Sequence, residues 1–304
     1  MALTINTNLS SMIVQQNLSK STASLNKAIE RMTTGYKINH ASDNAAGYSI
    51  ARNWEAKLGS LDVAADNAAT GADMLSTLED NYSLINSHIQ RVRDLTEQAA
   101  NGTYGSASLK AINSEIQARL KEVDRIAANC EFNGIELMSS KVGAGGLDIQ
   151  VGIDKDDKKS RINLEQNLFK SGAVKDLFAD ANLTLTEGKE VAEVAEKCTN
   201  FSSATDKMST GNYVAANMLE TIDKVINNIS NRVTSLGAAQ NRIESAIESI
   251  SVQTENITSS LSTLRDADVA TESSNYIKSQ ILQQASATLL ATANQTPSIA
   301  LNLL

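Results

Sequence analysis

The most regular feature of the sequence is a heptad pattern of hydrophobic positions in two stretches, one in each half of the chain. In both stretches the spacing alternates between three and four residues, which keeps one face of a supercoiled helix apolar. The positions are Leu75, Leu78, Tyr82, Ile85, Ile89, Val92, Thr96 and Ala99 in the first stretch, and Ile243, Ile247, Ile250, Thr254, Ile257, Leu261 and Leu264 in the second. Each stretch predicts a helix of roughly 37 Å that packs in a bundle. Asn101-Gly102 predicts the end of the first helix, because glycine accepts the left-handed backbone that closes helices.

Weaker helical patterns surround these stretches. One spans Ile112 to Val123, and another spans Met218 to Leu236 and can continue into the 243–264 stretch despite Gly237. Narrow apolar stripes also mark both chain ends: Leu18, Leu25 and Met32 near the N-terminus, and Ile277, Ile281, Ala285 and Leu289 near the C-terminus. Because so narrow a stripe does not stabilise an isolated helix, each terminal segment needs a partner surface.

The period changes in the middle of the chain. From Leu147 to Ile153 apolar and polar residues alternate, and Ile162 and Leu164 continue the alternation after a charged turn. This period of two is typical of half-buried strands and predicts a β-hairpin at about 145–166. Residues 171–205 read as irregular, apart from a short helical pattern at Val191, Val194 and Ala195. The patterns together predict a mainly α fold. We expect a long antiparallel helical bundle or coiled-coil rod, with a small β-hairpin insertion and with the N- and C-terminal helices paired.

Composition and charge exclude several classes of protein. Only 4% of the 304 residues are aromatic, which argues against one large enzyme-like core, and a single proline leaves long helices possible. A net charge of −8 without a cluster of Lys or Arg argues against a nucleic-acid partner. No run of about 18 apolar residues predicts a membrane span. The N-terminus also lacks the basic and apolar regions of a signal peptide, which by itself points to the cytoplasm.

No constellation of catalytic, cofactor-binding or metal-ligating residues is recognisable. His40 and His88 lack a second ligand at metal-binding spacing, so both are expected at the surface. The acidic run at 154–157 lacks the closing glutamate of a calcium loop. Cys130 and Cys198 form no disulfide framework and are predicted to be free thiols. We therefore expect no enzyme activity, no cofactor and no metal site.

Nine sequence blocks follow one another along the chain. In the N-terminal half they are Arg31–Asn39, Asp43–Ile50, Ile89–Leu95, Gln98–Asn101 and Glu131–Gly134; in the C-terminal half they are Leu236–Arg242, Asp266–Glu272, Gln280–Ala285 and Ala293–Pro297. In this order the blocks resemble the bacterial flagellin family. Together these blocks cover roughly residues 1–140 and 206–304. The chain departs from the family in its short middle, in its two cysteines and in its end at Leu303-Leu304 without a following arginine.

The resemblance implies a structural subunit that polymerises with itself into the helical flagellar filament used for motility. It implies an inner-tube domain formed by residues 1–43 and 266–304, a helical rod domain formed by 44–175 and 206–265, and a short outward segment at 176–205. The terminal segments are then expected to fold on assembly. The residues expected to be buried between subunits are Leu18, Leu25, Met32, Ile277, Ile281 and Leu289.

The resemblance also implies where the protein goes and what it meets. Similar flagellins leave the cell through a type III export apparatus without a cleaved signal, so the expected location is the extracellular filament and not the cytoplasm. The implied partners are an export chaperone on about residues 265–304, hook-associated and cap proteins, and the host Toll-like receptor for flagellin. The outward Ser and Thr residues between Ser139 and Thr210 are candidates for O-linked sugars.

Four residues correspond by motif to the receptor-binding face of the family: Ile89, Arg91, Leu95 and Glu115. Ile89 falls on the heptad stripe and favours packing over contact with a receptor. Arg91 and Leu95 lie four residues apart and off the stripe, which predicts a shared exposed face.

Three alternatives stay open at this point. A hook–filament junction protein or a filament cap component shares the helical ends. A flagellin that carries an enzyme would need a metalloprotease insert, and the sequence has no His-Glu-x-x-His motif. An unrelated coiled-coil scaffold would not explain the ordered blocks.

Overall fold

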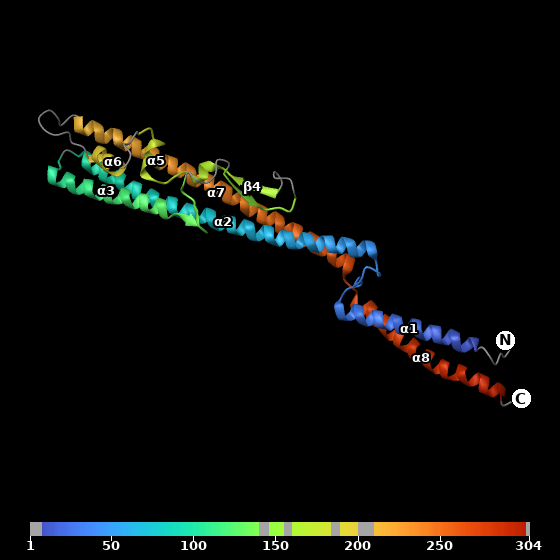
Figure 1. Cartoon of the computed structure of the whole chain (residues 1–304). Helices are drawn as coiled ribbons and strands as arrows, with labels where there is room; N and C mark the ends of the chain where they lie inside the picture. The colour runs from blue at the N-terminus through green and yellow to red at the C-terminus, as the bar shows by residue number, and fades with distance from the viewer. Residues whose placement is uncertain are drawn as a thin grey trace. The chain divides into compact units, whose positions relative to one another are not determined.

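The computed structural model describes residues 8–101, 103–139, 146–154, 160–183, 189–199 and 210–301, without the side chains of 210–217 and 296–301. Within these residues the chain forms two compact units. Unit 1 comprises residues 1–59 with 253–304, and unit 2 comprises residues 60–252. The two longest helices, α2 (Ala45–Ala100) and α7 (Thr210–Arg265), contribute a section to each unit (Figure 1). Each of these two helices has 56 residues, and α7 passes through Gly237 without a break, so the continuity expected there is confirmed.

Unit 1 pairs the two terminal helices, α1 (Leu9–Thr34) and α8 (Val269–Leu301), as the sequence predicted (Figure 1). Hydrogen bonds fix an antiparallel arrangement, because partners later in α1 lie earlier in α8. Asn8 donates to the carbonyl of Ala293, Gln283 donates to Thr22, and Arg31 donates to Glu272. At its ends, α1 is capped by the Asn8 side chain and by Gly35, whose φ of 76° lies in the left-handed region that favours glycine.

The two connections of unit 1 lie side by side. The loop after α1 and the turn between α7 and α8 form an antiparallel bridge at Tyr36 and Asp266. Arg265 stacks on the Tyr36 ring, with its guanidinium carbon 4.0 Å from the ring centroid, and forms an ion pair with Glu55. The Lys37 ammonium donates to the carbonyl of Thr263 at 2.7 Å. These contacts join the start of α2, the end of α7 and both loops at one point within unit 1.

The core of unit 2 is built by the heptad stripe of α2 against α3 (Ser106–Asn129) and α7. α2 and α7 run antiparallel there, since Arg93 pairs with Asp223 and Glu79 accepts a hydrogen bond from Gln240. All the predicted core positions between residues 75 and 99 are buried, and Thr96 satisfies its hydroxyl by donating to the carbonyl of Val92. α2 ends at Ala100, one residue before the predicted end, and Gly102 lies outside the described residues.

Two small β-hairpins follow α3. The first, β1 (Glu131–Phe132) with β2 (Ile135–Glu136), turns at Asn133-Gly134, where both residues have positive φ. The second, β3 (Leu147–Gln150) with β4 (Arg161–Leu164), pairs Ile149 with Ile162 and confirms the predicted hairpin. β3 stops at Gln150, however, and Ile153 is 37% exposed, so the strand is shorter than its alternation suggested. Most of the predicted charged turn lies at 155–159, outside the described residues.

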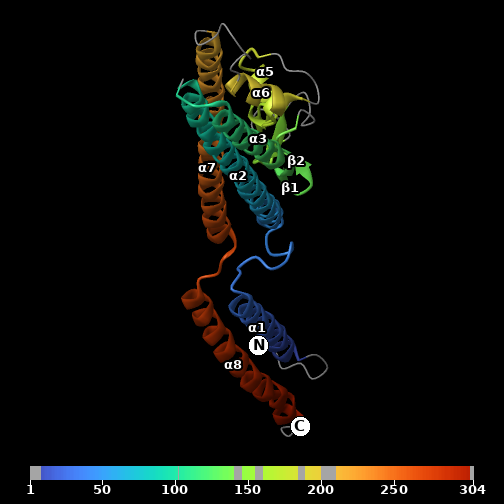
Figure 2. The same ribbon diagram turned by 90° about the vertical axis from the view of Figure 1, so that its left-hand side faces the viewer.

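The expectation that residues 171–205 are irregular outside the short helical pattern is wrong at 174–179, which form a helix. The short helix η1 (Gln166–Phe169) is followed by α5 (Val174–Ala179), and α6 (Glu190–Thr199) covers the predicted short helical pattern. In Figure 2, α5 and α6 lie beside α3. The core residues of this segment are Val174, Leu177, Phe178, Ala181, Val194, Ala195 and Cys198. The segment therefore closes the core of unit 2.

Candidate functional site

The fully buried residues on the face of α8 that packs on α1 are small or polar. Glu272, Ser279 and Ser286 are each spaced by seven residues and are 7%, 8% and 9% exposed. On the α1 side, Leu18 and Leu25 are half-buried and Ala28 is buried. On the same face of α8, Tyr276 and Leu290 are half-buried. The contact between the two helices therefore buries fully only polar residues of α8 and leaves the large apolar side chains of both helices partly exposed.

The apolar stripe of α8 faces away from α1. Ile277, Ile281 and Leu289 are 51%, 58% and 57% exposed, and Leu282 beside them is 47% exposed. α1 has an outward apolar face too, which includes Met32 at 37% exposed together with Leu9, Met12, Ile13 and Ile29. The six predicted tail residues thus fall into two groups. Leu18 and Leu25 are partly covered within the chain, whereas the other four are exposed.

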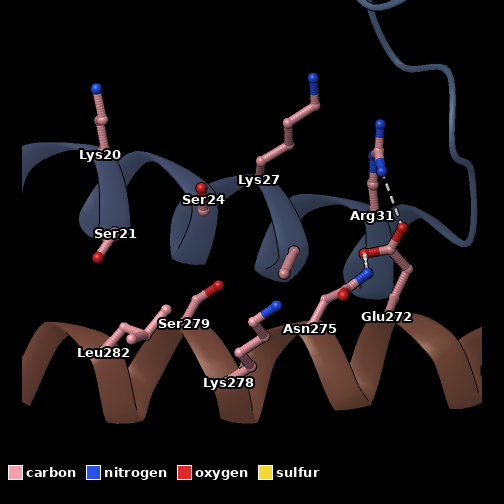
Figure 3. Close-up of a pocket in the computed structure, with 11 residues that line it drawn as sticks. Lys20, Ser21, Ser24, Lys27, Arg31, Glu272, Asn275, Lys278, Ser279 and Leu282 are labelled. Atoms are coloured by element: carbon pink, nitrogen blue, oxygen red, sulfur yellow. Dashed lines mark hydrogen bonds and ion pairs between the residues drawn. The ribbon is translucent and has the colours of Figure 1, made fainter. Parts of the chain in front are cut away.

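Between α1 and α8 runs a groove of about 480 Å³ that four basic side chains and Glu272 line (Figure 3). In Figure 3 the Lys278 ammonium points toward α1, whereas the ammonium groups of Lys20 and Lys27 point away from α8. Lys20, Lys27 and Arg31 line it from α1, and Lys278 lines it from α8. Two of the four cations are paired at short range: Arg31 with Glu272 at 2.9 Å, and Lys27 with Asp43 at 2.7 Å. The bond from Lys27, with the backbone N–H of His40, lowers the pKa of Asp43 to about 2.

The four residues of the expected receptor-binding face do not share one exposed surface. Ile89 is fully buried, in agreement with its place on the heptad stripe. Leu95 is only 1% exposed, so the expectation that it lies beside Arg91 on an exposed face is wrong. α2 contacts α3 on one side and α7 on the other, and this wide contact buries positions beyond a narrow heptad stripe. Arg91 and Glu115 are exposed and form an ion pair at 3.1 Å between α2 and α3.

A buried polar cluster in unit 2 was not found from the sequence. Arg232 of α7, with 9% of its side chain exposed, donates to Asp180 at 2.6 Å and to the carbonyl of Ser171 at 3.1 Å. Its guanidinium lies 5.7 Å from the centroid of the Tyr82 ring, and the Tyr82 hydroxyl donates to the carbonyl of Lys170 at 2.6 Å. Burial raises the pKa of this hydroxyl. The cluster therefore joins the residues that flank α5, Lys170 and Ser171 before it and Asp180 after it, to α2 and α7. The only sequence signal was a tyrosine among aliphatic heptad positions.

The remaining candidate residues carry no visible chemistry. His40 is exposed and lies 2.8 Å from Glu30, whereas His88 is half-buried rather than at the surface. Cys130 and Cys198 are free thiols, as predicted, and burial raises their pKa values to about 11 and about 12. Among the residues that the structure describes, no three His, Cys, Asp or Glu side chains gather closely enough to hold a metal ion. None of the described helices is both long and apolar enough to span a membrane.

Comparison with known proteins decides the family. Residues 5–142 match the model of the bacterial flagellin N-terminal helical region, and residues 219–304 match that of the C-terminal helical region. The chain belongs to the bacterial flagellin family. It is similar to a flagellin of Xenorhabdus nematophila, with 36% identity over 100% of both chains, and to one of Listeria monocytogenes, with 32% identity over 97% of both chains. The crystal structure of Bacillus cereus flagellin is also similar, with 21% identity and a TM-score of 0.43 over 64% of this chain and 94% of that chain.

Membership of the flagellin family establishes the general function of the chain. The chain is a structural subunit of the bacterial flagellar filament, an extracellular polymer that flagellin forms with itself, and it is not an enzyme. The two family matches include all of α1, α2, α3 and α8. Both helices with outward apolar faces therefore lie in the parts of the chain that flagellins share.

Proposed function

We propose that the chain enters the filament through the outward apolar faces of α1 and α8, and that both helices become fully ordered when neighbouring copies cover these faces. One observation carries the proposal. The α8 stripe of Ile277, Ile281 and Leu289 is more than half exposed, although these side chains are large and apolar. Because these side chains are already about half covered, burial of the remainder stabilises an assembly by about 1 kcal/mol each.

The composition of the α1–α8 contact supports coupled folding. The fully buried residues of α8 in this contact are Glu272, Ser279 and Ser286, and its apolar residues Tyr276 and Leu290 are only half-buried, so the contact inside one chain buries limited apolar surface. Helices with so little support are marginal when isolated. A subunit that completes its fold only on assembly also resists premature polymerisation.

The test is a charge placed on the α8 stripe. We expect Leu289→Asp to abolish filament elongation, because a buried carboxylate in the subunit contact would lack a partner. Ala287→Asp is the matched control, since Ala287 is exposed on α8 outside the stripe. Sedimentation and electron microscopy under polymerising conditions report the outcome. Long filaments from Leu289→Asp would contradict the proposal.

The same exposed surface supports the proposal for the route out of the cell. Before assembly, about residues 265–304 would expose Val269 and the α8 stripe, and an export chaperone that covers them would keep the segment soluble. This proposal includes export through a type III apparatus without a cleaved signal. It also includes contact with hook-associated and cap proteins. Co-purification of the chaperone with the wild-type chain, but not with a chain that lacks 266–304, is the expected result.

A second proposal concerns the host Toll-like receptor for flagellin. The observation that favours it is the exposed Arg91–Glu115 pair, whose side chains are 46% and 38% exposed. Arginines of this kind are enriched at binding hot spots, so Arg91→Ala should weaken binding of the monomer by about 1–3 kcal/mol. Arg125→Ala is the control, because Arg125 is exposed on α3 and pairs with Glu122 rather than with Glu115. Unchanged affinity of Arg91→Ala for the receptor ectodomain, with intact helicity by circular dichroism, would reject this role.

A further inference from the structure

The groove between α1 and α8 carries more positive than negative charge, because Lys20, Lys27, Arg31 and Lys278 line it against the single carboxylate of Glu272. Lys20 and Lys278 line it, and neither has a partner among the residues that the structure describes. Ser279, which is 8% exposed, points its hydroxyl from α8 toward α1 in Figure 3 and makes no hydrogen bond within the described residues. The buried Nε of Arg31, whose terminal nitrogen binds Glu272, also lacks an acceptor. Buried donors without acceptors are costly. The groove therefore fits a ligand that supplies carboxylate oxygens.

The chain carries a matching acidic surface on α2, in unit 2. Asp62, Asp66, Asp73 and Asp80 are exposed, and none of their carboxylates has a partner among the described residues. At 3.6 residues per turn, these positions fall on one face of the helix. Between Lys57 and Arg91 the sequence has no lysine or arginine, so nothing along this part of α2 neutralises the face. We call these four residues the acidic stripe.

The two surfaces match in spacing. Lys20 and Lys27 are seven residues apart on α1, although the Lys27 ammonium also pairs with Asp43, and Asp66, Asp73 and Asp80 are likewise separated by seven residues. Seven residues of helix rise about 10.5 Å, so two helices laid side by side can bring several unlike charges together at once. Rows of unlike charges at the same spacing select partner and register more than they add affinity.

We propose that the groove between α1 and α8 binds the acidic stripe of a second copy of this chain, with Lys20 and Lys278 as the main electrostatic contacts. This inference rests on the proposed self-assembly. It assigns to the terminal helices a second type of contact, which is ionic and distinct from the outward apolar stripe. Because exposed charges are screened beyond about 8 Å at physiological salt, the contact should weaken as salt rises.

The experiment uses charge reversal in the full chain. We expect Lys20→Glu with Lys278→Glu to raise the critical concentration for polymerisation at low salt by about tenfold, which corresponds to roughly 1.4 kcal/mol. Asp66→Lys with Asp73→Lys should do the same. The control is Lys57→Glu with Lys110→Glu, which makes the same change in net charge at exposed positions outside the groove.

Two combinations test the pairing itself. A chain that carries all four groove and stripe reversals should regain most of the wild-type assembly. A mixture of the two double variants should co-assemble better than either alone, which places the contact between copies. Assembly of either double variant at the wild-type concentration, or failure of both combinations, would overturn the inference. Circular dichroism checks the fold of each variant. If a reversal disturbs it, Lys20→Gln with Lys278→Gln should still flatten the dependence of assembly on salt.

The wild-type control separates this inference from the broader proposal. If the wild-type chain forms no filaments, the proposed function itself fails. If the wild type assembles and Leu289→Asp does not, while the groove reversals have no effect, only the ionic contact is refuted.

Discussion

The buried cluster around Arg232 gives the sharpest prediction of stability. Arg232→Met keeps an unbranched side chain of similar length in the core but removes the donors to Asp180 and to the carbonyl of Ser171. Both bonds have the charged guanidinium as donor, and a hydrogen bond with a charged partner contributes about 1.5–3 kcal/mol. The Asp180 side chain is 37% exposed, so water replaces part of the lost bond. We therefore expect a destabilisation of about 2–3 kcal/mol.

The comparison with Tyr82→Phe makes this estimate specific. That variant leaves the ring in place and removes only the hydroxyl that donates to Lys170, so it should cost about 1 kcal/mol. Arg242→Met, at an exposed position on the same helix, should cost less than about 0.5 kcal/mol.

Urea unfolding of the monomer, followed by circular dichroism at about 222 nm, measures all three variants. With an m-value of about 2 kcal/mol/M, Arg232→Met should lower the midpoint by about 1 M and Tyr82→Phe by about half as much. If Arg232→Met shifts the midpoint no further than Arg242→Met, the cluster does not hold the segment around α5, and the reasoning is wrong.

Three further predictions concern other parts of the chain. Burial raises the pKa values of Cys130 and Cys198 to about 11 and about 12, so a disulfide reagent at pH ~8 should react slowly with the folded protein. After unfolding, both thiols should react rapidly. Two rapidly reacting thiols in the folded monomer would contradict this prediction. The folded pKa of Asp43, about 2, lies below its ordinary value of 3.8, so the carboxylate stabilises unit 1 above pH ~4, and this contribution is lost as the pH falls through about 2. The backbone amides of Asn39 and His40 donate to this carboxylate, so their NMR chemical shifts should follow its titration, and Asp43→Asn should remove that pH dependence. Gly146→Ala should destabilise the β3–β4 hairpin by at least about 1–2 kcal/mol, because Gly146 has a φ of 84° and an added Cβ would clash with the carbonyl oxygen of Leu164. Hydrogen exchange of the backbone amides in β3 and β4 measures this effect. Gly105→Ala is the control, because nothing lies within 4 Å of a Cβ added there.

The long helices and their core could be predicted because their signal is repeated many times. Each heptad position of α2 adds to the same periodic pattern, so single exceptions such as Thr96 do not obscure it. The β3–β4 hairpin could be predicted for the same reason, from two alternating runs on either side of a charged turn. Resemblance to the flagellin family then agreed with both patterns, and the comparisons confirmed the family.

The elements that were missed have short signals or depend on contacts between segments. α5 has six residues, too few to show a helical period, and its burial depends on Val174 and Phe178 meeting a core built by other helices. The prediction that Leu95 is exposed is wrong because a heptad stripe describes the contact with one partner helix, whereas α2 packs against both α3 and α7. The ion pair between Arg232 and Asp180 joins positions 52 residues apart in the sequence, and residue types alone do not indicate such a contact.

The orientation of α8 shows why an apolar stripe does not by itself reveal its partner. Ile277, Ile281 and Leu289 predict that the helix needs a covering surface, and the nearest candidate in the chain is α1. Yet α8 turns Ser279 and Ser286 toward α1 and leaves the stripe exposed. Small residues allow the two helices to approach closely without burying the side chains that the proposed assembly uses. If Ser279 and Ser286 were replaced by leucine, the α1–α8 contact would become apolar, and the helices would no longer need a second copy to be ordered. The polar character of this contact is therefore what makes the proposed coupling between folding and assembly physically possible.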